Sequence, residues 1–176
     1  METIRSIKSI IYIELNGIYT LSESPVEDSK APIFHINPSL NLRGSGVVVA
    51  IVDTGIDYLN NEFMREDETT RILSIWDQTI DSGKTPDGFI SGSEYTEEDI
   101  NKAIQAQKQG QNPYDIVPSK DDYGHGTKMA GIVGARGINR EIVGVAPDCE
   151  FIIIKLQEAS KEYIDFYYAK GDKAKS

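Results

Sequence analysis

Two side chains in this sequence combine a residue type and a setting that suit acid–base chemistry. Asp53 directly follows an apolar run at residues 46–52, and His125 lies between two glycines. A serine hydroxyl is a poor nucleophile at neutral pH, so it needs a base within hydrogen-bonding reach, and that base needs a carboxylate on its other ring nitrogen. We therefore predict that Asp53 orients the imidazole of His125 and that His125 acts as general base and acid.

The sequence around Asp53 and His125 predicts the strands and the helix that position the two side chains. The uninterrupted apolar run before Asp53 is typical of a strand of a parallel sheet that is covered on both faces. Residues 151–156, apolar except for Lys155, form a second buried-strand run, and residues 71–76 are a further candidate strand. Residues 126–137 carry small and apolar side chains at helical spacing, which predicts a closely packed helix just after His125. Strand, helix and strand in this order indicate an α/β fold.

The predicted strand places Asp53 at its carboxyl end. In open α/β sheets this edge is where ligands and catalytic groups collect, because loops leave the buried sheet there. We therefore expect Asp53 and His125 to meet at the carboxyl edge of a parallel sheet.

Three segments resemble the motifs of one family, and they occur in the order in which that family has them. Residues 47–57 read Val-Val-Val-Ala-Ile-Val-Asp-Thr-Gly-Ile-Asp, residues 124–131 read Gly-His-Gly-Thr-Lys-Met-Ala-Gly, and residues 144–148 read Gly-Val-Ala-Pro-Asp. They are similar to the catalytic aspartate motif, the catalytic histidine motif and the following turn of the subtilases, the subtilisin-like serine proteases of peptidase family S8. Around Trp76-Asp77-Gln78-Thr79 and Asp57-Tyr58, the sequence looks most similar to clostridial subtilases, a branch that includes spore germination proteases. The resemblance implies a subtilisin-like parallel sheet with helices on both faces, a serine-type endopeptidase activity, and protein or peptide substrates.

The nucleophile that this resemblance implies is missing from the sequence. Subtilases carry their serine in a Gly-Thr-Ser-Met-Ala type of motif that opens a later helix, and no serine of this chain has that setting. Ser45, between two glycines, is the nearest imitation, but it precedes a strand, so we do not expect it to react. The resemblance places the serine, the oxyanion-binding asparagine and the substrate-binding strand beyond residue 176. The chain is therefore expected to be the N-terminal part of the fold and to be inactive alone.

Two other interpretations stay open at this point. A pseudoprotease or truncated subtilase relative would keep the fold for binding or sensing without catalysis. Asp-Thr-Gly after an apolar strand is also the signature of aspartic proteases, in which two such carboxylates share a proton. This sequence holds one copy, so that interpretation requires a homodimer.

The resemblance and the composition divide the chain into three expected regions. Residues 1–20 are expected to be the end of a propeptide, and residues 21–45 a linker or wrapping segment. Residues 46–176 are expected to be the N-terminal part of the catalytic domain. Within the third region, the polar stretch 77–122 is predicted to be an insertion, either a specificity element or a neutral surface addition. It contains one candidate helix near residues 97–107, with Thr96 as its N-cap.

Neither a cofactor nor a metal ligand is assigned from the sequence. Subtilases often bind structural calcium, but Asp57, Asp121 and Asp122 do not form an Asp-x-Asp-x-Asp-Gly loop and are interpreted as solvated loop residues. The single cysteine, Cys149, is interpreted as a small buried residue and not as a nucleophile. Lys128 is expected to face solvent.

Charge and hydropathy narrow the range of partners. The 176 residues include 18 Lys and Arg against 28 Asp and Glu, a net charge of −10, which repels nucleic-acid phosphates and anionic lipids. No signal peptide and no bilayer-length apolar run is visible, so we expect no nucleic-acid or membrane partner. The compartment is not predicted by the residues, although the resemblance implies a secreted or spore-associated protein. Because an incomplete parallel sheet has unpaired strand edges, self-association is expected.

Overall fold

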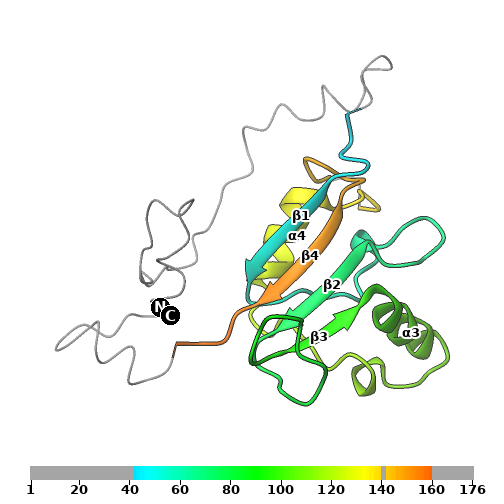
Figure 1. The fold of residues 1–176 in the computed structure, drawn as a ribbon. Coiled ribbons are helices and arrows are strands. Elements are labelled where there is room, and N and C mark those ends of the chain that lie inside the picture. Colours follow the sequence, from blue (N-terminus) through cyan, green and yellow to red (C-terminus); the bar gives the residue numbers. More distant parts are fainter. Residues whose placement is uncertain (1–41, 140–141, 160–176) are drawn as a thin grey trace, which may run out of the picture.

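A four-stranded sheet organises the part of the chain that the structure describes (Figure 1). The structure is a computed structural model and describes residues 42–139 and 142–159, so the expected propeptide end and nearly all of the expected linker lie outside the described residues. The strands are β1 (Val48–Asp53), β2 (Ile72–Asp77), β3 (Ser93–Thr96) and β4 (Glu150–Lys155). The helices are α3 (Glu97–Lys108) and α4 (His125–Gly134), with short 3₁₀ turns η1 (Asn61–Phe63) and η2 (Pro113–Asp115).

The strand order β1-β4-β2-β3 confirms the predicted α/β class. β4 pairs in parallel with both β1 and β2, and α4 lies between the parallel strands in sequence. The registers align Asp53 with Lys155 and Lys155 with Asp77, so three strand ends are level at the carboxyl edge. β3 was not predicted, and it pairs antiparallel with β2.

The hydrophobic core lies on one face of this sheet. Ile51, Ile75 and Ile153 are buried neighbours across β1, β2 and β4, and they pack in one cluster with side chains of both α3 and α4. The register shifts between Ile72 and Ser74, and this irregularity lets both Ile72 and Ile75 face the core.

The polar stretch 77–122 contributes to this core. Its predicted helix and cap are confirmed, since the Thr96 side chain accepts a hydrogen bond from the Asp99 backbone while the Asp99 side chain accepts one from the Thr96 backbone. The inner face of α3 and the segment after η2 are fully buried at Ile100, Ala103 and Val117. The stretch therefore helps to build the layer that covers the sheet.

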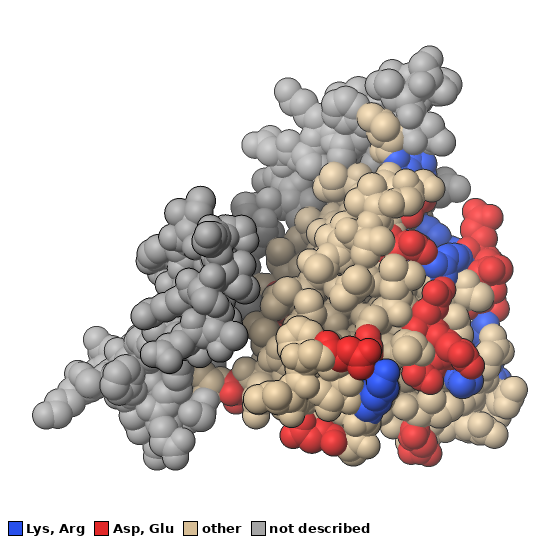
Figure 2. All heavy atoms as spheres, in the orientation of Figure 1, with Lys and Arg blue, Asp and Glu red and all other residues tan. Residues whose placement is uncertain are grey.

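The opposite face of the sheet is uncovered by the described residues. Val52 is 54% exposed, and Val48 and Ile152 are exposed on the same face. Figure 2 shows this face as a largely uncharged surface over β1 and β4, with charged side chains gathered toward β3 and α3. The expectation that β1 is covered on both faces is therefore met on one face only within the described part of the chain. None of the described helices is long and apolar enough to cross a membrane.

Phe151 tests which face holds the fold together. It is fully buried, stacks edge-on against Phe63 with ring centroids 5.7 Å apart, and lies against the helix α4 at Gly134. We expect Phe151→Ala to lower the free energy of unfolding by about 3–5 kcal/mol, measured by urea denaturation, because it leaves a cavity. Val52→Ala on the uncovered face should change it by less than about 0.5 kcal/mol. Similar losses from both substitutions would mean that the outer face is also packed.

Candidate active site

Asp53 and His125 meet at the carboxyl edge of the sheet, as predicted. Nδ1 of His125 lies 2.9 Å from each carboxylate oxygen of Asp53. The Asp53 side chain is only 9% exposed and its Oδ1 accepts the backbone N–H of Thr54 at 2.7 Å, whereas the His125 side chain is 21% exposed. A fixed, buried carboxylate thus faces an imidazole that solvent can still reach, which is the arrangement needed to set the ring tautomer and stabilise an imidazolium.

The start of α4 places His125 against the strand end. His125 is the first residue of the helix, and Gly124 before it adopts a φ of 74°, a conformation that favours glycine. A Cβ on Gly126 would collide with the backbone oxygen of Gly55. The backbone of the first helical turn can therefore approach the turn after β1 only because residue 126 has no side chain.

Asp121 links the segment after β1 to the start of α4. Its Oδ1 accepts hydrogen bonds from the Thr54 hydroxyl at 2.7 Å and from the Gly124 backbone at 2.9 Å. Its Oδ2 accepts from the backbone and hydroxyl of Thr127 at 2.8 and 2.6 Å. The Thr54 hydroxyl also accepts the Gly126 N–H at 3.0 Å. One carboxylate therefore links the residue after Asp53 to the first turn of α4 and satisfies backbone donors there.

This role corrects the interpretation of Asp121 as a solvated loop residue. Burial alone would raise the pKa of Asp121, but the hydrogen bonds from Thr127, Thr54 and Gly124 together outweigh it, so the pKa falls below its ordinary value of 3.8. Asp57 and Asp122 are exposed, as expected. Among the described residues, no three His, Cys, Asp or Glu side chains gather closely enough to hold a metal ion.

Lys155 and Asp77, which no sequence motif singled out, extend the carboxyl edge beside Asp53. Lys155 lies between the two aspartates in the sheet register, and its ammonium donates to the Lys120 carbonyl at 2.7 Å and lies 3.7 Å from Asp77 Oδ2. Asp77 is fully buried, with Oδ1 accepting the Thr79 backbone and hydroxyl. Lys155 therefore bridges this edge to the loop that precedes His125. The position of each residue at the end of a predicted strand was the available signal.

The alternative nucleophiles lie elsewhere. Ser45 is in the turn before β1, at the end of the strand opposite Asp53. Cys149 is buried next to Gly134, at the far end of the helix that His125 begins, and burial raises its pKa. Lys128 is exposed, as predicted. Since Asp53 faces an imidazole, its geometry also differs from the paired carboxylates of an aspartic protease.

Comparison with known families agrees with the geometry of the pair. A family profile described as the Subtilase family matches residues 44–173. Among solved structures, the chain is similar to the Clostridium perfringens CspB protease, with a TM-score of 0.61 and 34% identity. That match covers 73% of this chain and 24% of the other.

Curated relatives are also proteases, and they are much longer. The chain is 25% identical to the PII-type proteinase of Lacticaseibacillus paracasei, over 87% of this chain and 8% of that protein. It is 29% identical to the minor extracellular protease Vpr of Bacillus subtilis, over 78% of this chain and 14% of that protein. It is also 29% identical to an intracellular serine protease of Paenibacillus polymyxa, over 58% of this chain and 33% of that protein. The chain thus spans about a third or less of the length of these relatives.

Substitution of Asp121 tests whether its charge assembles the site. We expect Asp121→Asn to lower the free energy of unfolding by about 1–3 kcal/mol at pH 7, because an amide cannot accept all four hydrogen bonds. A lowered pKa means that the ionised carboxylate stabilises the fold above pH 3.8 and that this contribution is lost as the pH falls through the folded-state value.

The difference between the wild type and Asp121→Asn should therefore shrink below about pH 3.8, which thermal unfolding at pH 7 and pH 3 would measure. Asp122→Asn is the matched control, since Asp122 is the exposed neighbour, and it should have little effect at either pH. A loss from Asp121→Asn that is equal at both pH values would contradict a charge-dependent role.

Proposed function

The chain belongs to the subtilase family, and on that premise we propose that it supplies the aspartate and histidine of a serine endopeptidase. The observation that carries the proposal is the contact of His125 Nδ1 with both carboxylate oxygens of Asp53 at 2.9 Å, at the sheet edge where α/β enzymes place their chemistry. The catalytic roles of both residues are part of this proposal.

The geometry supports a defined path for the proton. With Nδ1 directed at Asp53, Nε2 of His125 takes the proton of a serine hydroxyl as its oxygen attacks the scissile carbonyl. The buried carboxylate of Asp53 stabilises the positive charge of the imidazolium that forms. The imidazolium then passes the proton to the departing amine as the acyl-enzyme forms. In the second half-reaction the same nitrogen takes a proton from water and returns it to the serine.

The nucleophile in this proposal lies outside residues 1–176. Support comes from the sequence, in which no serine has the setting of the family's nucleophile, and from Ser45, which the fold places at the opposite end of β1 from His125. In the proposal, residues 1–176 alone do not cleave peptides, because the groups that attack and stabilise the transition state are missing.

Partners and location follow from the same proposal. Substrates are proteins or peptides, in keeping with relatives named as proteinases. The uncovered apolar face of the sheet supports self-association wherever no other polypeptide covers it. A secreted or spore-associated location stays a prediction, since the relatives include an enzyme named as extracellular and another named as intracellular.

Labelling with a fluorophosphonate, which reacts with an activated serine, tests the proposal. We expect labelling of the complete product of the gene that encodes these residues, and none of the 176-residue chain alone. His125→Ala and Asp53→Asn in the complete product should each reduce the labelling rate by at least about a hundredfold, because the hydroxyl loses its base or the base loses its orientation.

The matched control is Asp87→Asn, which removes one exposed carboxylate outside the pair and should label at the wild-type rate. Labelling that survives His125→Ala would reject the proposed base. No labelling of the folded complete product would favour the alternative, a pseudoprotease in which the pair is structural.

A further inference from the structure

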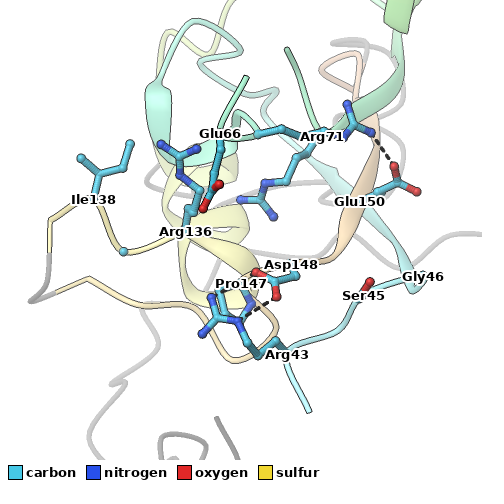
Figure 3. A pocket seen from close by; sticks show the side chains of 12 residues that line it. Arg43, Ser45, Gly46, Glu66, Arg71, Arg136, Ile138, Pro147, Asp148 and Glu150 are labelled. Atoms are coloured by element: carbon cyan, nitrogen blue, oxygen red, sulfur yellow. Dashed lines mark hydrogen bonds and ion pairs between the residues drawn. The ribbon is translucent and has the colours of Figure 1, made fainter. Parts of the chain in front are cut away.

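A charged cavity lies at the end of the parallel strands opposite Asp53 and His125. It has a volume of about 720 Å³ and is lined by four arginines, Arg43, Arg65, Arg71 and Arg136 (Figure 3). Arg43 precedes β1, Arg71 immediately precedes β2, and Arg136 follows the last residue of α4 by two positions. Elements that come together only in the folded sheet therefore build one basic cluster in a protein of net charge −10.

Two of these arginines are neutralised by carboxylates on the cavity wall. Nε and Nη2 of Arg43 donate to the two carboxylate oxygens of Asp148 at 2.7 and 3.0 Å. Arg65 forms ion pairs with Glu150 and, at 2.8 Å, with Glu97. These ion pairs hold the side chains of Arg43 and Arg65 in place and offset their positive charges.

Arg71 is a buried cation that lacks such a partner. It is 4% exposed, and its guanidinium donates to the carbonyls of Cys149, Glu62 and Gly134, which are neutral acceptors. Its Nε is buried without an acceptor, and within the described part of the chain it forms no ion pair with a carboxylate. Burial lowers the pKa of Arg71. Because an isolated buried charge is costly, an anion in the adjoining cavity would stabilise it.

Arg136, on the same cavity wall, also has a donor without an acceptor. Its side chain is half-buried, and its Nη1 is buried without an acceptor. No hydrogen bond or ion pair joins the Arg136 guanidinium to any other residue of the described ranges, 42–139 and 142–159. Glu66, which is exposed and lines the same cavity, also forms no ion pair within those ranges. The cavity thus offers one planar guanidinium with open donors beside a buried positive charge.

We propose that this cavity binds a small oxyanion, a carboxylate or phosphate group, which Arg136 holds by hydrogen bonds and Arg71 attracts by charge. A guanidinium presents its donors in a planar fork that matches two oxygens of either group. The volume of 720 Å³ is that of a small-molecule site, so the oxyanion has room for a short organic skeleton. Glu66 on the same wall repels such a ligand, and the repulsion grows with the charge of the anion.

The site is separate from the proposed catalytic pair. α4 begins at His125 and is 10 residues long, so about 15 Å of helix separates the imidazole from the loop that carries Arg136. Binding at the cavity therefore does not require a nucleophile, and it can be measured whether or not the protein hydrolyses peptides.

Titration calorimetry with inorganic phosphate and with malonate tests the proposal on the full chain at constant ionic strength. We expect saturable one-to-one binding, weakened about tenfold or more by Arg136→Gln because a charged hydrogen bond is lost. Glu66→Gln should tighten binding several-fold, because it removes a repelling carboxylate. The stronger of the two ligands identifies which oxyanion class the site prefers.

Lys102→Gln is the matched control, because it removes one positive charge from the exposed surface of α3, away from the cavity, and should leave binding unchanged. Equal binding by the wild type and a folded Arg136→Gln variant would overturn the proposal. So would an equal weakening by Lys102→Gln, which would show general attraction of anions, and so would the absence of saturable binding of both ligands.

Discussion

The part of this fold around Asp53 and His125 depends on one half-buried carboxylate, that of Asp121. Strand β1 ends at Asp53 and helix α4 begins at His125, 72 residues later, so nothing in the local chain brings the two together. Asp121 accepts hydrogen bonds from the segment after β1 and from the first turn of α4, and the missing side chain of Gly126 lets the two backbones touch. The contact between imidazole and carboxylate follows from this link, and so does the satisfaction of the donors at the start of the helix.

The direction of the parallel strands then divides the molecule into two chemically different ends. The carboxyl edge carries Asp53, Lys155 and Asp77 side by side, and the amino edge carries the arginine cavity. α4 joins the two ends, since its first residue is His125 and Arg71 donates to the carbonyl of its last residue, Gly134. A substitution that shifts one end of α4 is therefore expected to affect both the Asp53–His125 contact and the arginine cavity, because the same helix contributes to both.

Sequence patterns predicted the elements whose signals are local. The apolar runs predicted β1 and β4, small residues at helical spacing predicted α4, and Thr96 predicted the start of α3. The polar four-residue strand β3 has no such pattern, because its pairing with β2 supplies its stability. The role of Asp121 was misread for a similar reason, since its hydrogen-bond partners become neighbours only after folding. Arg71 and Arg136 have no motif, and only the packed sheet end reveals their shared cavity.

Within the described part of the chain, Asp53 and His125 are held in contact by hydrogen bonds from neighbouring segments. The hydrogen bonds among described residues that align Asp53 with His125 come from residues between 53 and 127. Val48, Val52 and Ile152 on the uncovered face take part in none of these hydrogen bonds. The pair can therefore be assembled before a nucleophile meets it, and a relative that has lost its serine would retain the same geometry for structural reasons. In the proposed mechanism, the chemistry depends on the group that approaches Nε2 of His125, whereas the position of the imidazole depends on Asp121 and on the close approach of Gly126 to Gly55.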